Sequence, residues 1–309
     1  MSNHPRIAIA PWSDDALVRA VKGGGGLIVD PPEAEGIVWV DPRDPSGLKD
    51  LLEGAPARWV QLPFAGIEAF IAADVIDENR LWTCTKGAYG HSTAEHALAL
   101  MLLACRRLHV HARDRKWVPA GLGSPERQLE GAVVVLIGTG GIGSALVAML
   151  EPLRPEVIAV NRSGKPLGGV TRTVPSTRLD NVIGEADFVV LAASATPETH
   201  HMIDGARLAA MKDTAWLINV ARGALVDHDA LVEALRADAI GGAALDVTEP
   251  EPLPENHPLW SMDRVVITPH VANTWDMALP ELRAVVQRNV ARFAAGQPLE
   301  GVVDVALGY

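Results

Sequence analysis

Cysteine is scarce in this chain, and acidic residues outnumber basic ones. Only two cysteines occur among 309 residues, Cys84 and Cys105, and they form no Cys-x-x-Cys pair or other metal-ligand spacing. This excludes a disulfide framework and suits a reducing compartment. The formal net charge of -11 argues against nucleic acid or an anionic membrane surface as a partner, because both require a basic face. Small anionic ligands remain open, because their binding depends on local groups.

Long hydrophobic runs are also missing, and no secretory signal is visible at the start of the sequence. Residues Met1 to Ala10 contain no basic stretch followed by an apolar one. The longest apolar run on an expected helix, Ala97 to Cys105, is far shorter than the ~20 residues that cross a bilayer. We therefore expect a cytoplasmic protein with no membrane partner. With 48% hydrophobic and 21% charged residues, the chain can bury a sizeable core.

Short apolar strands alternate with helical patterns through nearly the whole sequence, as in α/β proteins with parallel sheets. In a first block the expected strands are Ile7–Ala10, Leu27–Val29, Ile37–Val40, Trp59–Leu62 and Leu81–Cys84. In a second block, which begins at Gly131, they are Ala132–Ile137, Val157–Val160, Phe188–Ala192, Ala215–Val220, Gly242–Asp246 and Val265–Thr268. The second set matches the two mononucleotide halves of a dinucleotide-binding Rossmann domain.

A helix is expected to join the two blocks. Ser92 and Glu95 have the spacing of a capping box, so the helix is predicted to begin near Ser92. Its apolar run, Ala97 to Cys105, should be buried on every side, between domains or at a subunit contact. A Gly- and Pro-rich stretch, 118–128, is predicted to be a loop. A last helix, about 279–295, should pack back onto the first block, so we expect one domain from 1–92 plus 276–309 and another from 93–275.

A glycine-rich turn opens the second block. Gly138, Gly140 and Gly143 form a G-x-G-x-x-G pattern, completed here by Gly141 and Ile142. The pattern alone is weak, but here it follows an expected strand and opens a helix, which is the context that binding of a pyrophosphate requires. The helix N-terminus would supply free N–H groups and partial positive charge. We therefore predict a nicotinamide dinucleotide site.

The end of the next strand bears on the choice between NAD and NADP. NAD-binding proteins usually have Asp or Glu there, to hold the ribose 2′-hydroxyl. This chain has Asn161, Arg162 and Ser163, followed by Gly164 and Lys165. A guanidinium suits a 2′-phosphate, so NADP is favoured. In the other interpretation the two cations are a solvated loop and NAD is bound less selectively.

Ionisable residues follow three strands near the end of the second block. Arg222 follows the strand at 215–220, Glu251 lies in the segment after Asp246, and His270 ends Val-Val-Ile-Thr-Pro-His. Ligands of open α/β sheets bind outside the carboxyl ends of the strands. A cation, a carboxylate and an imidazole on one rim would form a plausible site for proton and hydride transfer.

With these segments the sequence resembles the D-isomer-specific 2-hydroxyacid dehydrogenase family over essentially the whole chain. The resemblance also includes Ala-Glu95-His-Ala-Leu and the stretch from Ala192 to Thr199. It implies two Rossmann-like or flavodoxin-like domains with doubly wound parallel sheets and an active-site cleft between them, the first being the substrate domain. The Asn161–Ser163 run is similar to the NADP-preferring glyoxylate and hydroxypyruvate reductases.

The resemblance implies a role for each ionisable residue. His270 would protonate the oxygen of a 2-keto acid as hydride reaches the carbon, and imidazoles exchange protons near neutral pH. Glu251 would hydrogen-bond and orient that imidazole; the neighbouring Glu249 is set aside because Glu251 directly precedes the matching Pro-Leu-Pro. Arg222 would bind the substrate carboxylate. Asp246 matches the residue that orients the nicotinamide carboxamide.

In the first block, Pro63 to Ile67 resembles a family loop whose backbone N–H groups bind the substrate carboxylate. The substrate residues predicted on that basis are Ala65, Gly66 and Ile67. Lys86 and Tyr89 are equally suited to contact the substrate or to lie in a solvated loop. Trp275 is equally suited to form a wall of the substrate pocket or to pack at a domain contact.

Other histidines and other functions complete the expectations. His96 is expected to be a packed core histidine rather than a catalyst. The remaining candidates are expected at the surface or in loops: His200, His201, His228 and His257. A homodimer is favoured by the apolar helix and the resemblance together. The alternative to an enzyme is a corepressor-like protein that senses the cofactor, since the fold alone allows both.

Overall fold

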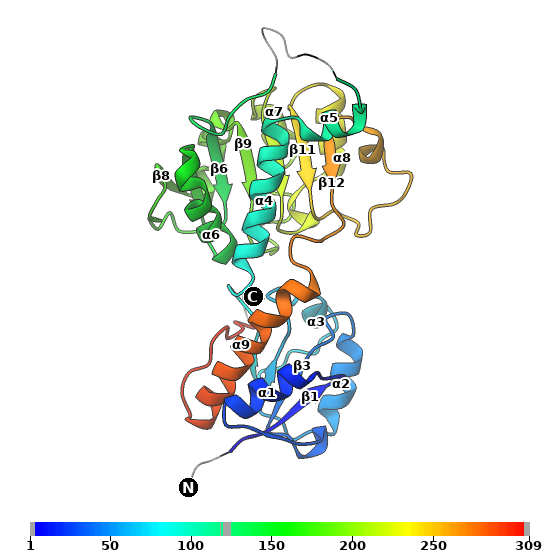
Figure 1. Cartoon of the computed structure of the whole chain (residues 1–309), viewed down its shortest axis with the longest axis vertical. Helices are drawn as coiled ribbons and strands as arrows, with labels where there is room; N and C mark the ends of the chain where they lie inside the picture. The colour runs from blue at the N-terminus through cyan, green and yellow to red at the C-terminus, as the bar shows by residue number, and fades with distance from the viewer. Residues whose placement is uncertain (1–3, 118, 120–124, 306–309) are drawn as a thin grey trace. The chain divides into compact units, whose positions relative to one another are not determined.

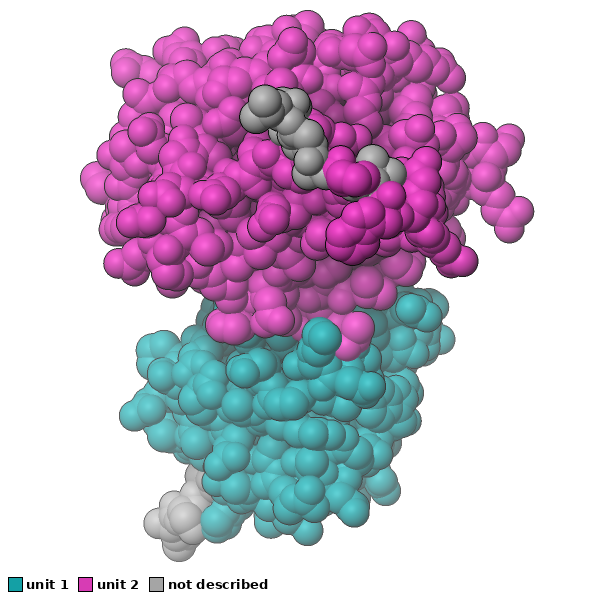
Figure 2. Space-filling model, turned by 45° about the horizontal axis from the view of Figure 1, so that its top comes forward, with its two compact units in different colours: residues 1–89, 275–309 teal, residues 90–274 magenta. Residues whose placement is uncertain are grey.

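The computed structural model describes residues 4–117, 119 and 125–305, and the chain divides into two compact units (Figure 1; Figure 2). Unit 1 comprises residues 1–89 and 275–309, and unit 2 comprises residues 90–274. The sequence placed the boundaries after residues 92 and 275, whereas the units divide after residues 89 and 274. The loop predicted over 118–128 falls largely outside the described residues.

Unit 1 is built on a five-stranded parallel sheet with the order β2-β1-β3-β4-β5. Its strands are β1 (Arg6–Ala10), β2 (Leu27–Ile28), β3 (Gly36–Trp39), β4 (Trp59–Gln61) and β5 (Leu81–Thr83). All five correspond to strands that the hydrophobic pattern predicted. The order is that of the doubly wound, flavodoxin-like arrangement.

Helices cover both faces of this sheet. They are α1 (Asp15–Gly23), η1 (Pro31–Glu33), α2 (Pro45–Glu53), α3 (Glu68–Ala72) and α9 (Trp275–Ala294). Side chains alternate across β3, so that Ile37 and Trp39 face a core with α2 and α3, whereas Val38 faces a core with α1 and α9. Helix α9 brings Leu282 and Val286 into that second core, so the C-terminal helix completes the unit that the N-terminal segment begins.

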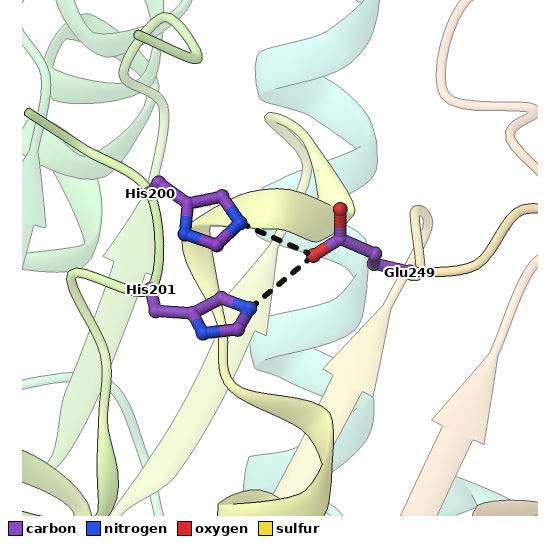
Figure 3. Close-up of side chains that lie close together, drawn as sticks. All are labelled: His200, His201 and Glu249. Atoms are coloured by element: carbon purple, nitrogen blue, oxygen red, sulfur yellow. Dashed lines mark hydrogen bonds and ion pairs between the residues drawn. The ribbon is translucent and has the colours of Figure 1, made fainter. Parts of the chain in front are cut away.

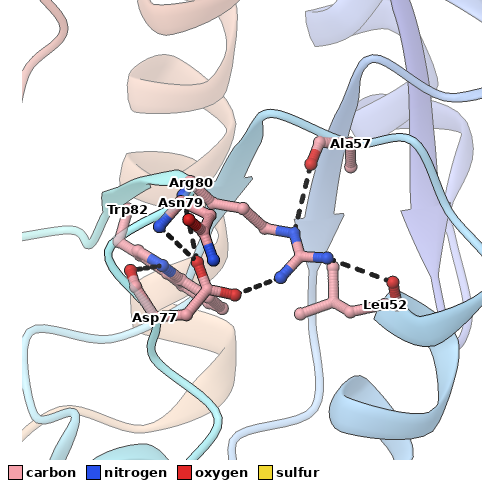
Figure 4. Close-up of polar contacts among 6 residues, drawn as sticks. All are labelled: Leu52, Ala57, Asp77, Asn79, Arg80 and Trp82. Carbon is pink, nitrogen blue, oxygen red and sulfur yellow. Dashed lines mark hydrogen bonds and ion pairs between the residues drawn. The ribbon is translucent and has the colours of Figure 1, made fainter.

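A half-buried arginine, Arg80, holds the turn that leads into β5 (Figure 4). The Arg80 guanidinium donates to the carbonyl of Ala57 at 3.1 Å, to that of Leu52 at 3.2 Å, and to the Asp77 carboxylate. The Trp82 indole donates to the Asp77 carbonyl at 2.9 Å. Because Leu52 lies in the last turn of α2, Ala57 precedes β4 and Arg80 precedes β5, this network joins three elements of the unit and has a structural role.

Unit 2 contains a seven-stranded parallel sheet with the order β12-β11-β10-β9-β6-β7-β8. Its strands are β6 (Val133–Ile137), β7 (Glu156–Asn161), β8 (Arg172–Pro175), β9 (Phe188–Leu191), β10 (Trp216–Asn219), β11 (Gly242–Leu245) and β12 (Val265–Ile267). Read from β8 to β11, the order is that of a Rossmann domain, with β12 added at the far edge. The sequence predicted six of these strands and missed β8.

Both faces of the second sheet are covered as well. The helices are α4 (Gly90–Cys105), α5 (Leu108–Asp114), α6 (Gly141–Leu150), η2 (Glu151–Leu153), η3 (Ser176–Asn181), η4 (Ile183–Glu185), α7 (Gly205–Ala210), η5 (Gly223–Leu225), α8 (His228–Arg236) and η6 (Pro258–Ser261). Helices α4 and α6 share a core with alternate residues of the central strands, and α7 and α8 share the opposite core.

One expectation about the first helix of unit 2 is wrong: Ser92 and Glu95 do not form the capping box that starts it. Helix α4 begins at Gly90, so Ser92 lies inside the helix, where its hydroxyl bonds the Asn273 side chain at 2.9 Å instead of capping. A Cβ on Gly90 would lie 2.5 Å from the Gly141 carbonyl, which shows how closely α4 approaches α6. Within this chain Ala99 and Leu102 of α4 are exposed, so burial of the helix on every side at a subunit contact stays a prediction. Among the described residues, no helix combines the length and hydrophobicity that crossing a membrane requires.

Candidate active site

Three neighbouring strands of unit 2 end in the loops that carry the predicted catalytic residues. β10, β11 and β12 are adjacent and parallel, so their carboxyl ends lie at one edge of the sheet. Arg222 follows β10, Glu251 follows β11 and His270 follows β12. The sheet therefore brings residues that are far apart in the sequence to one rim, where open α/β sheets bind their ligands.

The structure joins His270 and Glu251 directly. His270 Nδ1 and Glu251 Oε1 are 2.6 Å apart, and the two side chains are 47% and 43% exposed. A carboxylate only accepts, so Nδ1 carries the proton of this bond. His270 Nε2 has no partner among the described residues, so it is available to a ligand. Glu249 does not reach His270, and its carboxylate lies instead beside His200 and His201.

The backbone of the His270 turn is held by Asp246. The side chain of Asp246 is only 1% exposed, and its oxygens accept the N–H of Val271 at 2.9 Å, the N–H of Ala272 at 3.0 Å and the Thr268 hydroxyl at 2.6 Å. The His270 N–H donates to the Asp246 carbonyl at 2.8 Å. His270 itself has a left-handed conformation, with φ of 53°. Such conformations persist where the surrounding structure fixes them, and here a buried carboxylate does so.

Arg222 lies on a turn that is braced by a fully buried amide. The Asn219 side chain donates to the Arg222 carbonyl at 2.9 Å and accepts the Ala221 N–H at 3.0 Å. A Cβ on Gly223 would lie 2.0 Å from the Thr248 carbonyl, so the loops after β10 and β11 touch through their backbones. The loop of Arg222 is thus fixed against the loop that leads to Glu251.

The glycine-rich turn has the local geometry that a dinucleotide needs. Gly138 has φ of 103°, and a Cβ there would lie 2.4 Å from the Ala192 carbonyl oxygen. A Cβ on Gly143 would lie 2.1 Å from the Gly138 carbonyl oxygen, whereas one on Gly140 would meet open space. No side chain caps the start of α6, where Gly141 and Ile142 lie in the first turn. The residues therefore fit a pyrophosphate on this helix N-terminus.

The end of β7 carries cations and no carboxylate. The Asn161 amide donates to the Lys165 carbonyl at 2.8 Å, and Ser163 Oγ accepts the Lys165 N–H at 3.3 Å, which closes a turn with Arg162 exposed on it. Glu198, on the loop after β9, interacts electrostatically with Arg162. The pKa of the Glu198 carboxyl is lowered first by a hydrogen bond from the Thr196 side chain, with a smaller contribution from the charge of Arg162.

In unit 1 two side-chain hydroxyls hold the expected substrate loop, residues 63–67, in place. Thr85 Oγ1 and Tyr89 Oη each donate to the Pro63 carbonyl at 2.5 Å. Burial raises the pKa of the Tyr89 phenol, so it stays protonated as a donor. The predicted substrate-binding N–H groups are those of Ala65, Gly66 and Ile67. Among the described residues, these three backbone N–H groups have no hydrogen-bond acceptor.

The structure also places the residues whose roles were open. Tyr89 is buried and braces the loop at Pro63, whereas Lys86 is exposed. Trp275 packs within unit 1 against Phe64 and Trp12, each with ring centroids 5.4 Å from its own. This packing lies within unit 1, so a wall of the substrate pocket and a domain contact both stay predictions for Trp275.

The environments of His96 and His228 can be compared with the sequence-based expectations. His96 contacts the Thr268 hydroxyl at 3.0 Å through Nε2 and lies 3.5 Å from Asp246 Oδ1, so it packs behind the His270 turn. His228 was expected at the surface, and that is wrong. It is 6% exposed, because the helix α8 that it begins is packed on the sheet.

The sequence did not reveal two polar residues that hold the site together, Asn219 and Thr268. Each ends or directly follows a strand of the rim, and each bonds a loop that starts from its own or a neighbouring strand. The one available signal was their place: a polar residue at the end of an apolar strand, next to the candidate Arg222 or His270 segment.

Comparisons with known proteins agree with this fold and identify the family. The sequence profile described as "D-isomer specific 2-hydroxyacid dehydrogenase, NAD binding domain" matches residues 98–272. A glyoxylate reductase of Thermofilum pendens is 36% identical over 232 residues, which cover 72% of this chain and 67% of that protein.

Two solved structures extend the likeness to almost the whole chain. A D-isomer specific 2-hydroxyacid dehydrogenase from Xanthobacter autotrophicus Py2, in complex with NADPH and MES, has a TM-score of 0.85 and 27% identity over 99% of this chain and 100% of its own. An NADPH-dependent glyoxylate/hydroxypyruvate reductase from Sinorhizobium meliloti, in complex with NADP and sulfate, has a TM-score of 0.82 and 26% identity over 99% and 100%. The chain belongs to the D-isomer specific 2-hydroxyacid dehydrogenase family, and it is an oxidoreductase of that type with a nicotinamide cofactor.

Proposed function

We propose that the protein reduces a small 2-keto acid to the D-2-hydroxy acid, with His270 as the proton donor. The observation that carries this proposal is the 2.6 Å contact between His270 Nδ1 and Glu251 Oε1. It fixes one ring nitrogen on a carboxylate and leaves Nε2 for the substrate. An imidazole oriented in this way by an acidic partner is the usual arrangement of a general acid.

The reduced nicotinamide, when bound, supplies the hydride. In the reduction the carbonyl carbon gains a C–H bond and the carbonyl oxygen gains an O–H bond, while the C=O π bond breaks. The proton comes from Nε2 of the imidazolium form of His270, and Glu251 keeps the ring oriented while its charge changes. Arg222 binds the substrate carboxylate, for which a guanidinium can supply two parallel hydrogen bonds. The N–H groups of Ala65, Gly66 and Ile67 are the second group of donors for that carboxylate.

Glyoxylate and hydroxypyruvate are the keto acids that we propose first. The support is indirect: the Thermofilum pendens relative is named a glyoxylate reductase, and the Sinorhizobium meliloti structure a glyoxylate/hydroxypyruvate reductase. For the cofactor we propose NADPH over NADH. The turn after β7 offers Asn161, Arg162 and Ser163 and no carboxylate that would repel a 2′-phosphate, and both structural relatives named above were crystallised with NADPH or NADP.

Asp246 is proposed to serve the cofactor site through the loop that it holds. The family resemblance implies that Asp246 orients the nicotinamide carboxamide. Its carboxylate, however, is buried and accepts from Val271, Ala272 and Thr268. We therefore give it a positioning role for the His270 turn.

The test follows the decrease in NADPH absorbance with glyoxylate, hydroxypyruvate, pyruvate and phenylpyruvate. His270→Asn is the informative variant, because asparagine tolerates the left-handed backbone of this position but cannot act as an acid. We expect kcat to fall about 100- to 10,000-fold while NADPH affinity stays near that of the wild type. His111→Ala, which removes an exposed imidazole of unit 2, is the control and should keep full activity.

Two outcomes would decide against the proposal. A fully active His270→Asn enzyme would remove this imidazole from the chemistry. Tight NADPH binding without turnover of any of the four keto acids would favour a protein that senses the cofactor.

A further inference from the structure

Two consecutive histidines and a glutamate of unit 2, none of them part of the His270–Glu251 pair, lie close together (Figure 3). His200 and His201 follow β9, and Glu249 follows β11. Glu249 Oε2 is 3.3 Å from His201 Nε2 and 3.9 Å from His200 Nε2. The three potential ligand atoms all lie within 4.8 Å of one another. Within the described part of the chain this is the only such group of three.

The spacing and the atom types suit a zinc-like ion. Ligand bonds of about 2.0–2.1 Å in a tetrahedral site place neighbouring ligand atoms about 3.3 Å apart. His201 and Glu249 already have that separation, and His200 needs only a small side-chain movement. Imidazole nitrogen favours transition metals over Mg²⁺ and Ca²⁺, which prefer oxygen ligands. The three side chains are 40–54% exposed, so an ion and a completing water have access.

The backbone holds these ligands in place before any ion binds. The His200 N–H donates to the Thr196 carbonyl at 3.0 Å, and the His201 N–H donates to the Ala224 carbonyl at 2.8 Å. The same segment touches the Glu249 loop, because a Cβ on Gly223 would lie 2.6 Å from the Glu249 nitrogen. Both ligand-bearing loops are thus fixed against residues 223–224.

An imidazole–carboxylate hydrogen bond is the simpler explanation of the contact between His201 and Glu249. It does not account for His200. That ring stacks on His201 with centroids 3.9 Å apart and planes inclined by 22°, and its Nε2 also points to Glu249 (Figure 3). If both rings were positively charged imidazolium ions, they would repel each other, whereas two neutral imidazoles can both coordinate one cation.

We propose that His200, His201 and Glu249 form a binding site for one divalent transition-metal ion of the zinc type, with water completing its coordination. Glu249 lies two residues before Glu251, and its loop touches the residue after Arg222. A bound ion would cross-link the loops that carry those side chains and so modulate turnover. This regulatory part rests on the proposed function, whereas the binding itself does not.

The experiment titrates Zn²⁺ into the full chain, prepared without a histidine tag and stripped with a chelator, in an isothermal calorimeter. We expect one ion per chain. Removing one ligand, in His201→Ala or Glu249→Gln, should weaken binding about 100-fold or more, since even outer partners of metal ligands contribute 10- to 100-fold. The matched control is His111→Ala, because His111 and Glu126 form an exposed imidazole–carboxylate pair at 3.1 Å that lacks a second histidine. Co²⁺ should give the intense visible bands of a four-coordinate ion in the wild type and not in Glu249→Gln.

Several results would overturn the site. The site is refuted if the wild type does not bind Zn²⁺ or if both ligand variants bind it as tightly as the wild type. It is also refuted if His111→Ala loses as much Zn²⁺ affinity as the ligand variants do. Circular dichroism of each variant establishes that it is folded. Keto acid reduction measured with and without Zn²⁺ tests regulation: a change in the wild type but not in Glu249→Gln supports it, and no change removes it. Absence of reduction in every sample would refute the proposed function and leave the calorimetry to judge the site.

Discussion

The carboxylate of Asp246 offers a sharp test of how the His270 turn is held. Oδ1 accepts from the Val271 N–H and the Thr268 hydroxyl, and Oδ2 accepts from the Ala272 N–H. Both oxygens are therefore occupied by donors. In Asp246→Asn one oxygen becomes an NH₂ group, which cannot accept, so one donor must lose its partner in either amide orientation.

The cost of that loss follows from the contacts. A buried N–H left without an acceptor costs about 1–3 kcal/mol, and each hydrogen bond that loses its charged acceptor weakens by about 1 kcal/mol. The smaller desolvation cost of a neutral amide offsets part of this. We expect the turn to be destabilised by about 2–3 kcal/mol, which corresponds to a roughly 30- to 150-fold change in its opening equilibrium.

Amide hydrogen exchange measures this opening directly. In Asp246→Asn the amides of Val271 and Ala272 should exchange about 30- to 150-fold faster than in the wild type, and kcat should fall because His270 is less well held. Asp213→Asn makes the same chemical change at an exposed position and should alter neither quantity. Unchanged exchange at Val271 and Ala272 in Asp246→Asn would refute the idea that the carboxylate holds the turn.

Three further predictions address the cofactor and the core of unit 2. Arg162→Ala should weaken NADPH binding about 10- to 100-fold and NADH binding little, because a charge-assisted hydrogen bond contributes about 1.5–3 kcal/mol. Fluorescence titration measures the affinity for both cofactors, with Arg172→Ala as the control. Equal losses of NADPH and NADH affinity would contradict the 2′-phosphate assignment. Gly140→Ala should weaken both cofactors without lowering Tm, whereas Gly143→Ala should lower Tm, because only the second Cβ meets backbone. Burial lowers the pKa of His228 below its ordinary 6.5, so the folded chain protonates this imidazole less readily than the unfolded chain does. The stability that the neutral His228 contributes is therefore complete above pH 6.5 and is lost as the pH falls below it. The drop in the free energy of unfolding between about pH 7.5 and about pH 5.5 should therefore be smaller in His228→Leu, and an equal drop would contradict this.

Hydrophobic pattern predicted the strands well, and its failures have physical causes. The missed strand β8 reads Arg-Thr-Val-Pro, pairs only with β7 at the sheet edge, and has no fully buried residue, so it carries little hydrophobic signal. The start of α4 was placed two residues late, because Ser92 and Glu95 have the spacing of a cap by coincidence. The observed start, Gly90, lies close to Gly141, a contact distant in sequence that no local pattern reveals.

The candidate site, like the fold, could be predicted from the sequence only in part. Arg222, Glu251 and His270 could be named because parallel strands must end at one edge and because their segments resemble a family. The bonds that hold them could not be predicted, since they join residues far apart in the sequence, such as Asp246 and Val271. His228 was misplaced because the packing of α8 on the sheet, which joins residues far apart in the sequence, buries it.

One loop fixes His270 at both its backbone and its side chain. Asp246, at the start of the loop after β11, holds the amides that follow His270, and Glu251, further along, holds the imidazole. Because both contacts come from the same segment, any shift of that loop moves the ring and its acidic partner together and preserves their 2.6 Å contact. The orientation of Nε2 is then set by the position of the β11 loop relative to the sheet, and the backbone contact between Gly223 and Thr248 ties that position to the loop of Arg222. The cation and the proton donor are thus positioned as one unit, although no contact between their side chains is needed.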